Sequence, residues 1–280
     1  MRVTGQEIEH LIELALSEDI GCGDVTSRLL LPDDPSGRAV IMAKQDGVLA
    51  GLPVAGMVFR AVNPKLVLKA FKRDGDRIRR GEKIVSVRGK TRSILSAERT
   101  ALNFLQRLSG IATLTSKYVD EVKGTGTKIL DTRKTTPGLR VLEKYAVKTG
   151  GGGNHRMGLF DMILIKENHI QAAGGVSKAV LRARSKRRKE KVEVEIRNLP
   201  EAREAVKSKP DWIMLDNMRI DRMRRAVELI RSADRAIKIE ASGSVGLKNV
   251  RRIASTGVDF ISVGALTHSA PALDMSLILT

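Results

Sequence analysis

The chain contains few of the residues and segments that would tie it to an oxidising compartment or to a membrane. Cys22 is its single cysteine, which excludes an internal disulfide, and no Cys/His cluster surrounds it to form a zinc site. No apolar run approaches the roughly 20 residues of a membrane span, and the first residues lack the apolar core of a signal peptide. We therefore expect a cytoplasmic protein without a membrane partner, in which Cys22 is a small structural residue.

Aromatic and acidic residues are also scarce. Aromatics make up 3% of the chain, and 32 acidic residues face 50 basic ones, for a net charge of +18. This charge is compatible with nucleic acid, a membrane surface or small anions. The shortage of aromatic rings disfavours base stacking on a single strand, and the densest basic stretch, 178–191, fits the solvated end of a helix. We expect no specific nucleic-acid partner, while a basic nucleic-acid-binding protein stays open as an alternative.

The first part of the chain has the pattern of an α+β domain. Residues 6–18 have the apolar period of an amphipathic helix. Short alternating runs within 38–92, separated by Asp-Gly and Arg-Gly turns, predict β-strands, and 94–108 predict a further helix. We interpret residues 1–109 as a β-sandwich-like domain with flanking helices, and we expect a C-terminal tail, 271–280, to return to it.

After residue 110, short apolar strands alternate with helical stretches, as is typical of a parallel sheet. Residues 110–270 are too few for a complete eight-unit barrel of about 250 residues. No Gly-x-Gly-x-x-Gly turn follows a strand, which disfavours a doubly wound sheet. We predict an α/β domain with a seven-stranded incomplete TIM-like barrel. Its expected strands are 128–131, 146–149, 162–166, 192–196, 212–216, 237–241 and 260–263.

Polar residues follow the expected strands, at the ends that share one face of a barrel and there form active sites. The densest group is 131–138 (Asp-Thr-Arg-Lys-Thr-Thr-Pro-Gly) together with the glycine-rich 150–156. Cations crowded in this way repel one another unless an anion lies among them, and glycines let backbone N–H groups approach that anion. The sequence therefore indicates small, multiply charged ligands, namely carboxylates, phosphates or both. The residues concerned are Asp131, Arg133, Lys134, His155, Arg156, Lys166, Glu195, Asp216, Ser242, Gly243 and Gly264.

The alternation inside two strands predicts which charged side chains point into the barrel. Glu193 and Glu195 share one face of their strand, and Glu240 alternates likewise in 237–242. Buried charges must be paired, so we expect a network of opposite charges in the lumen, with a purely structural salt-bridge lattice as the alternative. The expected members of the network are Lys166, Glu195, Asp216 and Glu240.

Motifs that cover nearly the whole chain resemble those of one enzyme family. The motifs are 18–27, 96–103, 131–138, 150–158, 165–169, 192–196, 214–217, 240–243 and 261–269. Together they resemble quinolinate phosphoribosyltransferase, also called nicotinate-nucleotide pyrophosphorylase (carboxylating). The resemblance implies phosphoribosyl transfer from phosphoribosyl pyrophosphate (PRPP) to quinolinate, with release of pyrophosphate and carbon dioxide. The product would be nicotinate mononucleotide, in de novo NAD synthesis, with Mg²⁺ as cofactor.

The resemblance also implies roles for individual residues. Quinolinate would contact Arg99, Arg133, His155, Arg156 and Lys166. PRPP and its phosphates would contact Lys134, Glu195, Asp216, Ser242, Gly243, Ser244, Gly264 and Ala265. The catalytic residues would be Lys134, Lys166, Glu195 and Asp216, and Glu195 and Asp216 would also face Mg²⁺, directly or through the substrate. Arg99 matches an arginine that reaches into the neighbouring subunit's site, which implies a homodimer with shared active sites, or a hexamer of three such dimers.

Two positions depart from the family pattern, and one related protein is an alternative. Glu167 stands where relatives commonly have Asp, and Ser244 where Gly or Asn is common. His169 and His268 match family positions, but we interpret both as structural.

A molybdenum-transport-associated protein shares this fold. Lys166 and the intact Thr-Arg-Lys-Thr of 132–135 favour the transferase.

Overall fold

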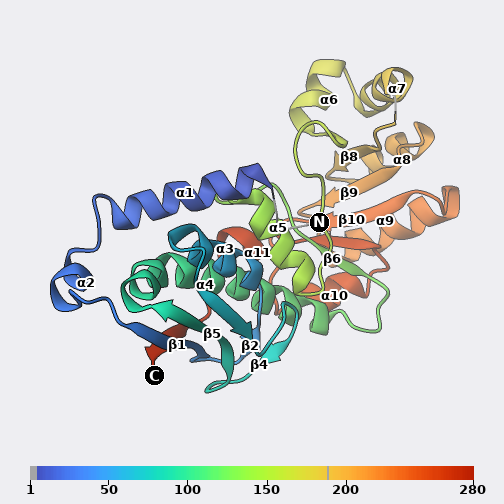
Figure 1. The fold of residues 1–280 in the computed structure, drawn as a ribbon. Coiled ribbons are helices and arrows are strands. Elements are labelled where there is room, and N and C mark those ends of the chain that lie inside the picture. The colour runs from blue at the N-terminus through green and yellow to red at the C-terminus, as the bar shows by residue number, and fades with distance from the viewer. Residues whose placement is uncertain (1–4, 188) are drawn as a thin grey trace. The chain divides into compact units, whose positions relative to one another are not determined.

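The computed structural model describes residues 5–187 and 189–280, and the chain divides into two compact units (Figure 1). Unit 1 comprises the residues up to 116, together with 135–151 and 267–280, and unit 2 comprises 117–134 and 152–266. Among the described residues, no helix is long and apolar enough to cross a membrane.

Unit 1 is built around a four-stranded antiparallel sheet with the order β12-β1-β5-β3. Its strands are β1 (Ser36–Ala43), β3 (Val67–Ala70), β5 (Lys83–Lys90) and β12 (Met275–Leu279), and β2 (Gly47–Val48) pairs separately with β4 (Arg77–Ile78). The strands expected within 38–92 are confirmed. β12 lies beside β1, with Met275 opposite Ala43, so the end of the chain completes the sheet of its first part.

The helices of unit 1 begin where the sequence provides caps and apolar faces. They are α1 (Gln6–Ile20), α2 (Val25–Leu30), α3 (Leu52–Val62), α4 (Thr91–Glu121), whose last residues belong to unit 2, and α5 (Arg140–Thr149). The Asp24 carboxylate starts α2 by accepting the backbone N–H and the hydroxyl of Ser27 at 2.9 and 2.5 Å. Ile8 and Ile12 give α1 its buried face, and both helices expected from the apolar period are confirmed.

Unit 2 holds a six-stranded parallel sheet with the order β6-β11-β10-β9-β8-β7. The strands are β6 (Lys128–Leu130), β7 (Ile163–Ile165), β8 (Val192–Ile196), β9 (Trp212–Asp216), β10 (Lys238–Ser242) and β11 (Phe260–Ser262). The helices between or after them are α6 (Glu167–Ala173), α7 (Val176–Lys186), α8 (Leu199–Lys207), α9 (Ile220–Ala233), α10 (Val250–Ala254) and α11 (Ala265–His268). The sheet follows chain order from β7 to β11, and β6 closes the series beside β11.

The predicted strand at 146–149 is wrong, because Ala146–Thr149 is the last turn of α5. Leu142 and Ala146, four residues apart, are both buried on one face of that helix, so the short apolar run belongs to a helical rather than an alternating pattern. The chain meets the sheet only later, through a single parallel bridge between Gly153 and Leu130 of β6. The other six expected strands of this part are confirmed, β8 and β9 with the predicted bounds.

Candidate active site

The register of the parallel sheet gathers acidic side chains on one face, which we call the inner face. Glu193 of β8 lies opposite Trp212 of β9, and Met214 of β9 lies between Glu195 of β8 and Glu240 of β10. Laterally paired residues point to the same side of a sheet, so these side chains share a face. The shared face that the sequence predicted for Glu193 and Glu195 is therefore confirmed.

Asp131, directly after β6, anchors the segment that crosses this inner face. The residue is completely buried. Its Oδ1 accepts the backbone N–H of His155 at 2.9 Å, and its Oδ2 accepts the side-chain amide of Asn154 at 2.5 Å. The backbone N–H of Gly153 also donates to Ile129 of β6 at 2.7 Å. These bonds fix the glycine-rich segment against the end of β6.

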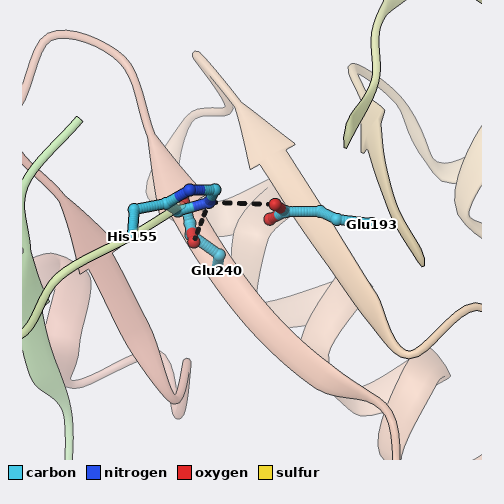
Figure 2. Close-up of side chains that lie close together, drawn as sticks. All are labelled: His155, Glu193 and Glu240. Atoms are coloured by element: carbon cyan, nitrogen blue, oxygen red, sulfur yellow. Dashed lines mark hydrogen bonds and ion pairs between the residues drawn. The ribbon is translucent and has the colours of Figure 1, made fainter. Parts of the chain in front are cut away.

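Figure 2 shows His155 between two carboxyl groups, Glu193 and Glu240. Its Nε2 lies 2.9 Å from Oε2 of Glu193 and 3.5 Å from Oε2 of Glu240. Its Nδ1 accepts the backbone N–H of Arg156 at 2.7 Å. A ring nitrogen that accepts a hydrogen bond carries no proton, so this network assigns the proton of a neutral imidazole to Nε2. Only 6% of the His155 side chain is exposed.

The two carboxyl groups beside His155 are completely buried. The pKa of Glu193 is raised to about 8, mainly by burial; the charges of Arg156 and Lys166 lower it, and the charge of Glu195 raises it. Burial, followed by the charge of Glu193, raises the pKa of Glu240 to about 8 as well. The pair therefore retains a proton near neutral pH. Ser262 donates its hydroxyl to Oε1 of Glu240 at 2.5 Å.

Lys166 follows β7 and pairs with an acidic residue on the inner face. Its ammonium lies 3.1 Å from Oε2 of Glu195, which confirms one pair of the charge network expected from the sequence. The Lys166 side chain remains 52% exposed, so it can also reach a ligand. Nδ1 of His169 accepts the backbone N–H of Lys166 at 3.0 Å at the start of α6, a contact of the kind that a structural histidine makes.

Asp216, the last residue of β9, is held by two neighbours. Both of its carboxylate oxygens lie 3.1 Å from the side-chain amide of Asn217, and Nε of Arg197 lies 3.9 Å from Oδ2. Arg197 also forms an ion pair of 2.6 Å with Glu167. Sequence reasoning missed Arg197, although its place directly after β8 was the signal that could have identified it. Glu167, the departure from the family pattern, thus belongs to the surroundings of Asp216.

The loop after β10 has a left-handed backbone conformation at Gly243, where a side chain does not fit. Gly243 has a φ of +91°, and a Cβ there would lie 2.2 Å from Oδ1 of Asn217. The backbone N–H of Asn217 donates to the Ser242 carbonyl at 2.9 Å, and the Ser244 hydroxyl donates to Oδ1 of Asn217 at 3.3 Å. A cavity of about 200 Å³ is lined by this loop and by Asn217. The loop after β10 and the Asn217 side chain therefore hold each other in place through these hydrogen bonds.

The cations of the first motif remain at the surface of unit 2. Arg133 and Lys134 are exposed, and the backbone N–H of Lys134 donates to the Thr132 hydroxyl at 3.0 Å. Partial burial, and then the charge of Arg133, lower the pKa of Arg156. The two guanidinium groups thus repel each other, as expected from the sequence, and an anion between them would relieve this repulsion.

The remaining predicted site residues lie in different places. Gly264 and Ala265 are half-buried just after β11. Arg99 is an exposed residue of α4 in unit 1, whereas the other predicted site residues belong to unit 2. His268 lies with Nδ1 2.6 Å from the Ser269 hydroxyl. The contacts of unit 2 bring together His155, Glu193 and Glu240, then Lys166 and Glu195, and finally Asp216 with Arg197 and Asn217.

A parallel α/β sheet with paired carboxylates, lysine and repelling arginines at its carboxyl edge defines an enzyme-like site for small anions. Residues 24–109 match the family model described as quinolinate phosphoribosyl transferase, N-terminal domain, and 111–278 match the model of the C-terminal domain. The chain belongs to the quinolinate phosphoribosyltransferase family.

Curated relatives and solved structures resemble almost the entire chain. Quinolinate phosphoribosyltransferase [decarboxylating] 1b of Nicotiana tabacum is 46% identical, over 97% of this chain and 82% of the relative. A probable nicotinate-nucleotide pyrophosphorylase [carboxylating] of Synechocystis is 45% identical, over 96% and 92% of the two chains. The crystal structure of NadC from Streptococcus pyogenes is 40% identical with a TM-score of 0.95, covering 100% of this chain and 99% of that one.

Proposed function

We propose that this protein transfers the phosphoribosyl group of PRPP to quinolinate and decarboxylates the adduct, giving nicotinate mononucleotide, pyrophosphate and carbon dioxide. The observation that carries this proposal is the edge of the parallel sheet, where Arg133 and Arg156 repel each other close to the Lys166–Glu195 pair. Two carboxylates on quinolinate and the phosphates of PRPP are the anions that such an edge accommodates. The names of the relatives support the same reaction, a step of de novo NAD synthesis.

The quinolinate carboxylates are bound in this proposal by Arg133, His155, Arg156 and Lys166. A guanidinium grips a carboxylate through two parallel hydrogen bonds, which suits a flat diacid. Arg99 of a neighbouring subunit completes the set, so the working form is a homodimer with shared active sites, alone or within a hexamer of three dimers. Arg99 is exposed on α4, which leaves it available for this role.

The PRPP side of the site lies in the loops after β10 and β11. Backbone N–H groups in such loops bind phosphate in many barrel enzymes. Lys134 contacts the pyrophosphate, while Glu195 and Asp216 face the ribose hydroxyl groups. The proposed 5′-phosphate contacts are Ser242, Gly243, Ser244, Gly264 and Ala265.

Glu195 and Asp216 fit a magnesium ion by their chemistry. Carboxylate oxygens are the ligands that Mg²⁺ prefers, usually together with water and substrate phosphates. The two side chains are only 10% and 17% exposed, and they lie on the adjacent strands β8 and β9. When bound there, directly or through PRPP, the ion supplies positive charge beside the leaving pyrophosphate.

The chemistry proceeds without a covalent enzyme intermediate. The C1–O bond of PRPP breaks, pyrophosphate leaves with the electron pair, and the pyridine nitrogen of quinolinate attacks the oxocarbenium-like C1. Lys134 and Lys166 stabilise the departing negative charge. The positive ring nitrogen then withdraws electrons from the adjacent carbon, carbon dioxide leaves, and a solvent proton takes its place.

The proposal extends to the architecture and the compartment. We place an N-terminal α/β sandwich domain at 1–109, the catalytic domain at 110–270, and a tail at 271–280 that returns to the first domain through β12. The catalytic sheet is an incomplete TIM-like barrel, open between Gly153 and β7. Its strand order and the bridge between Gly153 and Leu130 support this description. The working compartment is the cytoplasm.

The experiment is a product assay. Purified protein is incubated with quinolinate, PRPP and Mg²⁺, and nicotinate mononucleotide is measured by chromatography, with nicotinate replacing quinolinate in a control. The expected result is product from quinolinate alone. Absence of product from a folded sample would redirect the proposal to another phosphoribosyl acceptor or to the transport-associated relative.

A further inference from the structure

Two buried acidic residues have no role in the proposed reaction. Glu193 and Glu240 are completely buried on the inner face of the sheet, and each lies within ion-pair distance of Nε2 of His155. We propose that Glu193 and Glu240 are positioning residues, which hold the His155 imidazole in one orientation and thereby fix the backbone of Arg156 at the quinolinate site. This inference rests on the proposed function for the identity of the ligand.

Contacts on several sides of the His155 ring hold it in place, which supports the positioning role. Nε2 faces Glu193 and Glu240, and Nδ1 accepts the backbone N–H of Arg156. The ring also meets Trp212 edge-on, with centroids 6.1 Å apart and planes at 79°. Its own backbone N–H is bound by Asp131. The imidazole therefore links the carboxyl groups of Glu193 and Glu240 to the backbone N–H of Arg156.

Burying the two carboxyl groups costs free energy that few contacts offset. Among the described residues, the ion pairs of Glu193 and Glu240 join them only to His155, and neither has a Lys or Arg partner within 4.0 Å. Within the same part of the chain, Oε1 of Glu193 and Oε2 of Glu240 have no hydrogen-bond partner. Apolar residues of similar size would serve packing at least as well. A structural lattice therefore does not explain these acids, whereas the orientation of His155 does.

The direction of the effect follows from the tautomer. The Glu193 acceptor, 2.9 Å from Nε2, keeps the proton on that nitrogen, with the Glu240 carboxyl group at 3.5 Å on the same side of the ring. The lone pair of Nδ1 is then left to accept the Arg156 N–H. Without the Glu193 acceptor, the ring can carry its proton on Nδ1 or rotate, and the bond to Arg156 is lost. A misplaced guanidinium weakens quinolinate binding but leaves the PRPP loops untouched.

The kinetic test compares variants that keep or remove the acceptor oxygen. Glu193→Gln retains an oxygen acceptor, whereas Glu193→Met has a similar length and none. We expect Glu193→Met to raise the KM for quinolinate by about five- to tenfold, corresponding to the loss of one hydrogen bond of about 1–1.4 kcal/mol. The KM for PRPP should change by less than about twofold, and Glu193→Gln should stay near the parent enzyme. Met214→Leu, on the same face between Glu195 and Glu240, is the matched control for altered packing.

Equal effects of Glu193→Gln and Glu193→Met, or parallel shifts in both KM values, would overturn the inference. A second measurement remains decisive if the methionine variant fails to fold. The protein has 4 histidines, so long-range ¹H–¹⁵N spectra of histidine-labelled protein can report the tautomer of each ring, and His155→Gln identifies the relevant signals. We expect the parent His155 to carry its proton on Nε2 at neutral pH.

A parent spectrum with the proton on Nδ1, or with both nitrogens protonated, would contradict the positioning role. This measurement needs no turnover. Failure of the proposed function would appear as an inactive parent enzyme with an intact Nε2–H tautomer. Failure of the present inference would appear as an active parent enzyme with a different tautomer, or as unchanged quinolinate KM in Glu193→Met.

Discussion

Gly243→Ala gives a sharp test of the proposed phosphate loop, because the structure leaves no room for a methyl group there. Gly243 has a φ of +91°, and a Cβ added to it would lie 2.2–2.6 Å from the amide atoms of Asn217. Asn217 is itself in the left-handed region, with a φ of 50°, and its N–H is bound to the Ser242 carbonyl. The methyl group must therefore displace the Asn217 side chain or the loop.

The magnitude follows from two contributions. An L-residue held in such a backbone conformation costs about 1–3 kcal/mol. Displacing Asn217 breaks its side-chain hydrogen bonds to Asp216 and Ser244, and each lost bond costs about 1 kcal/mol. If about 2 kcal/mol of this cost falls on the loop conformation that binds PRPP, the KM for PRPP rises roughly thirtyfold.

The assay measures the KM for PRPP and the melting temperature in parallel. Gly246→Ala is the matched control in the same loop, because nothing lies within 4 Å of the Cβ position there. We expect Gly246→Ala to resemble the parent protein and Gly243→Ala to lose PRPP affinity. An unchanged KM for PRPP in Gly243→Ala, with Gly246→Ala equally unaffected, would refute the placement of the phosphate site in this loop.

Three further predictions follow from the site. Arg133→Ala should lower kcat/KM for quinolinate by at least about a hundredfold through the loss of a charged hydrogen-bond pair, with an unchanged circular dichroism spectrum, while Arg222→Ala on the exposed face of α9 should retain full activity. Because burial raises the pKa of Glu193 and Glu240 from 4.5 to about 8, their protonated forms stabilise the folded state below pH 4.5 and this contribution is lost as the pH rises through 8. Urea unfolding should therefore show a free energy that falls by up to about 1.4 kcal/mol per pH unit per proton in this window, and Glu240→Gln should flatten the slope. Removal of divalent ions with EDTA should abolish turnover, Mg²⁺ should restore it, and the melting temperature should stay constant; a lasting activity in EDTA would argue against the Mg²⁺ assignment.

The sequence predicted the elements of unit 2 wherever the hydrophobic pattern was unambiguous. β8 has apolar residues alternating with Glu193 and Glu195, and both bounds of the strand were correct. The run 146–149 has only four residues, too few to separate a strand from the end of a helix. The helical period of Leu142 and Ala146 emerges only when the longer segment is considered.

The partners of individual side chains were less predictable, because they depend on which strands become neighbours. Lys166 and Glu195 were expected together and lie together, since β7 and β8 are adjacent. Glu240 was expected in the same network, yet its side chain lies beside His155 and Ser262. The segment that carries His155 is held across the inner face by Asp131 and by the bonds of Gly153 to β6, and nothing in the local pattern specifies those contacts.

In the proposed function, phosphoribosyl transfer and decarboxylation are coupled on one protein. The most direct measurement uses quinolinate labelled with ¹³C in the carboxylate beside the ring nitrogen, together with PRPP and Mg²⁺, and records pyrophosphate and labelled carbon dioxide in the same reaction. We expect the two to be released in equal amounts as nicotinate mononucleotide forms. Pyrophosphate release without labelled carbon dioxide, or no release of either from folded protein, would contradict it.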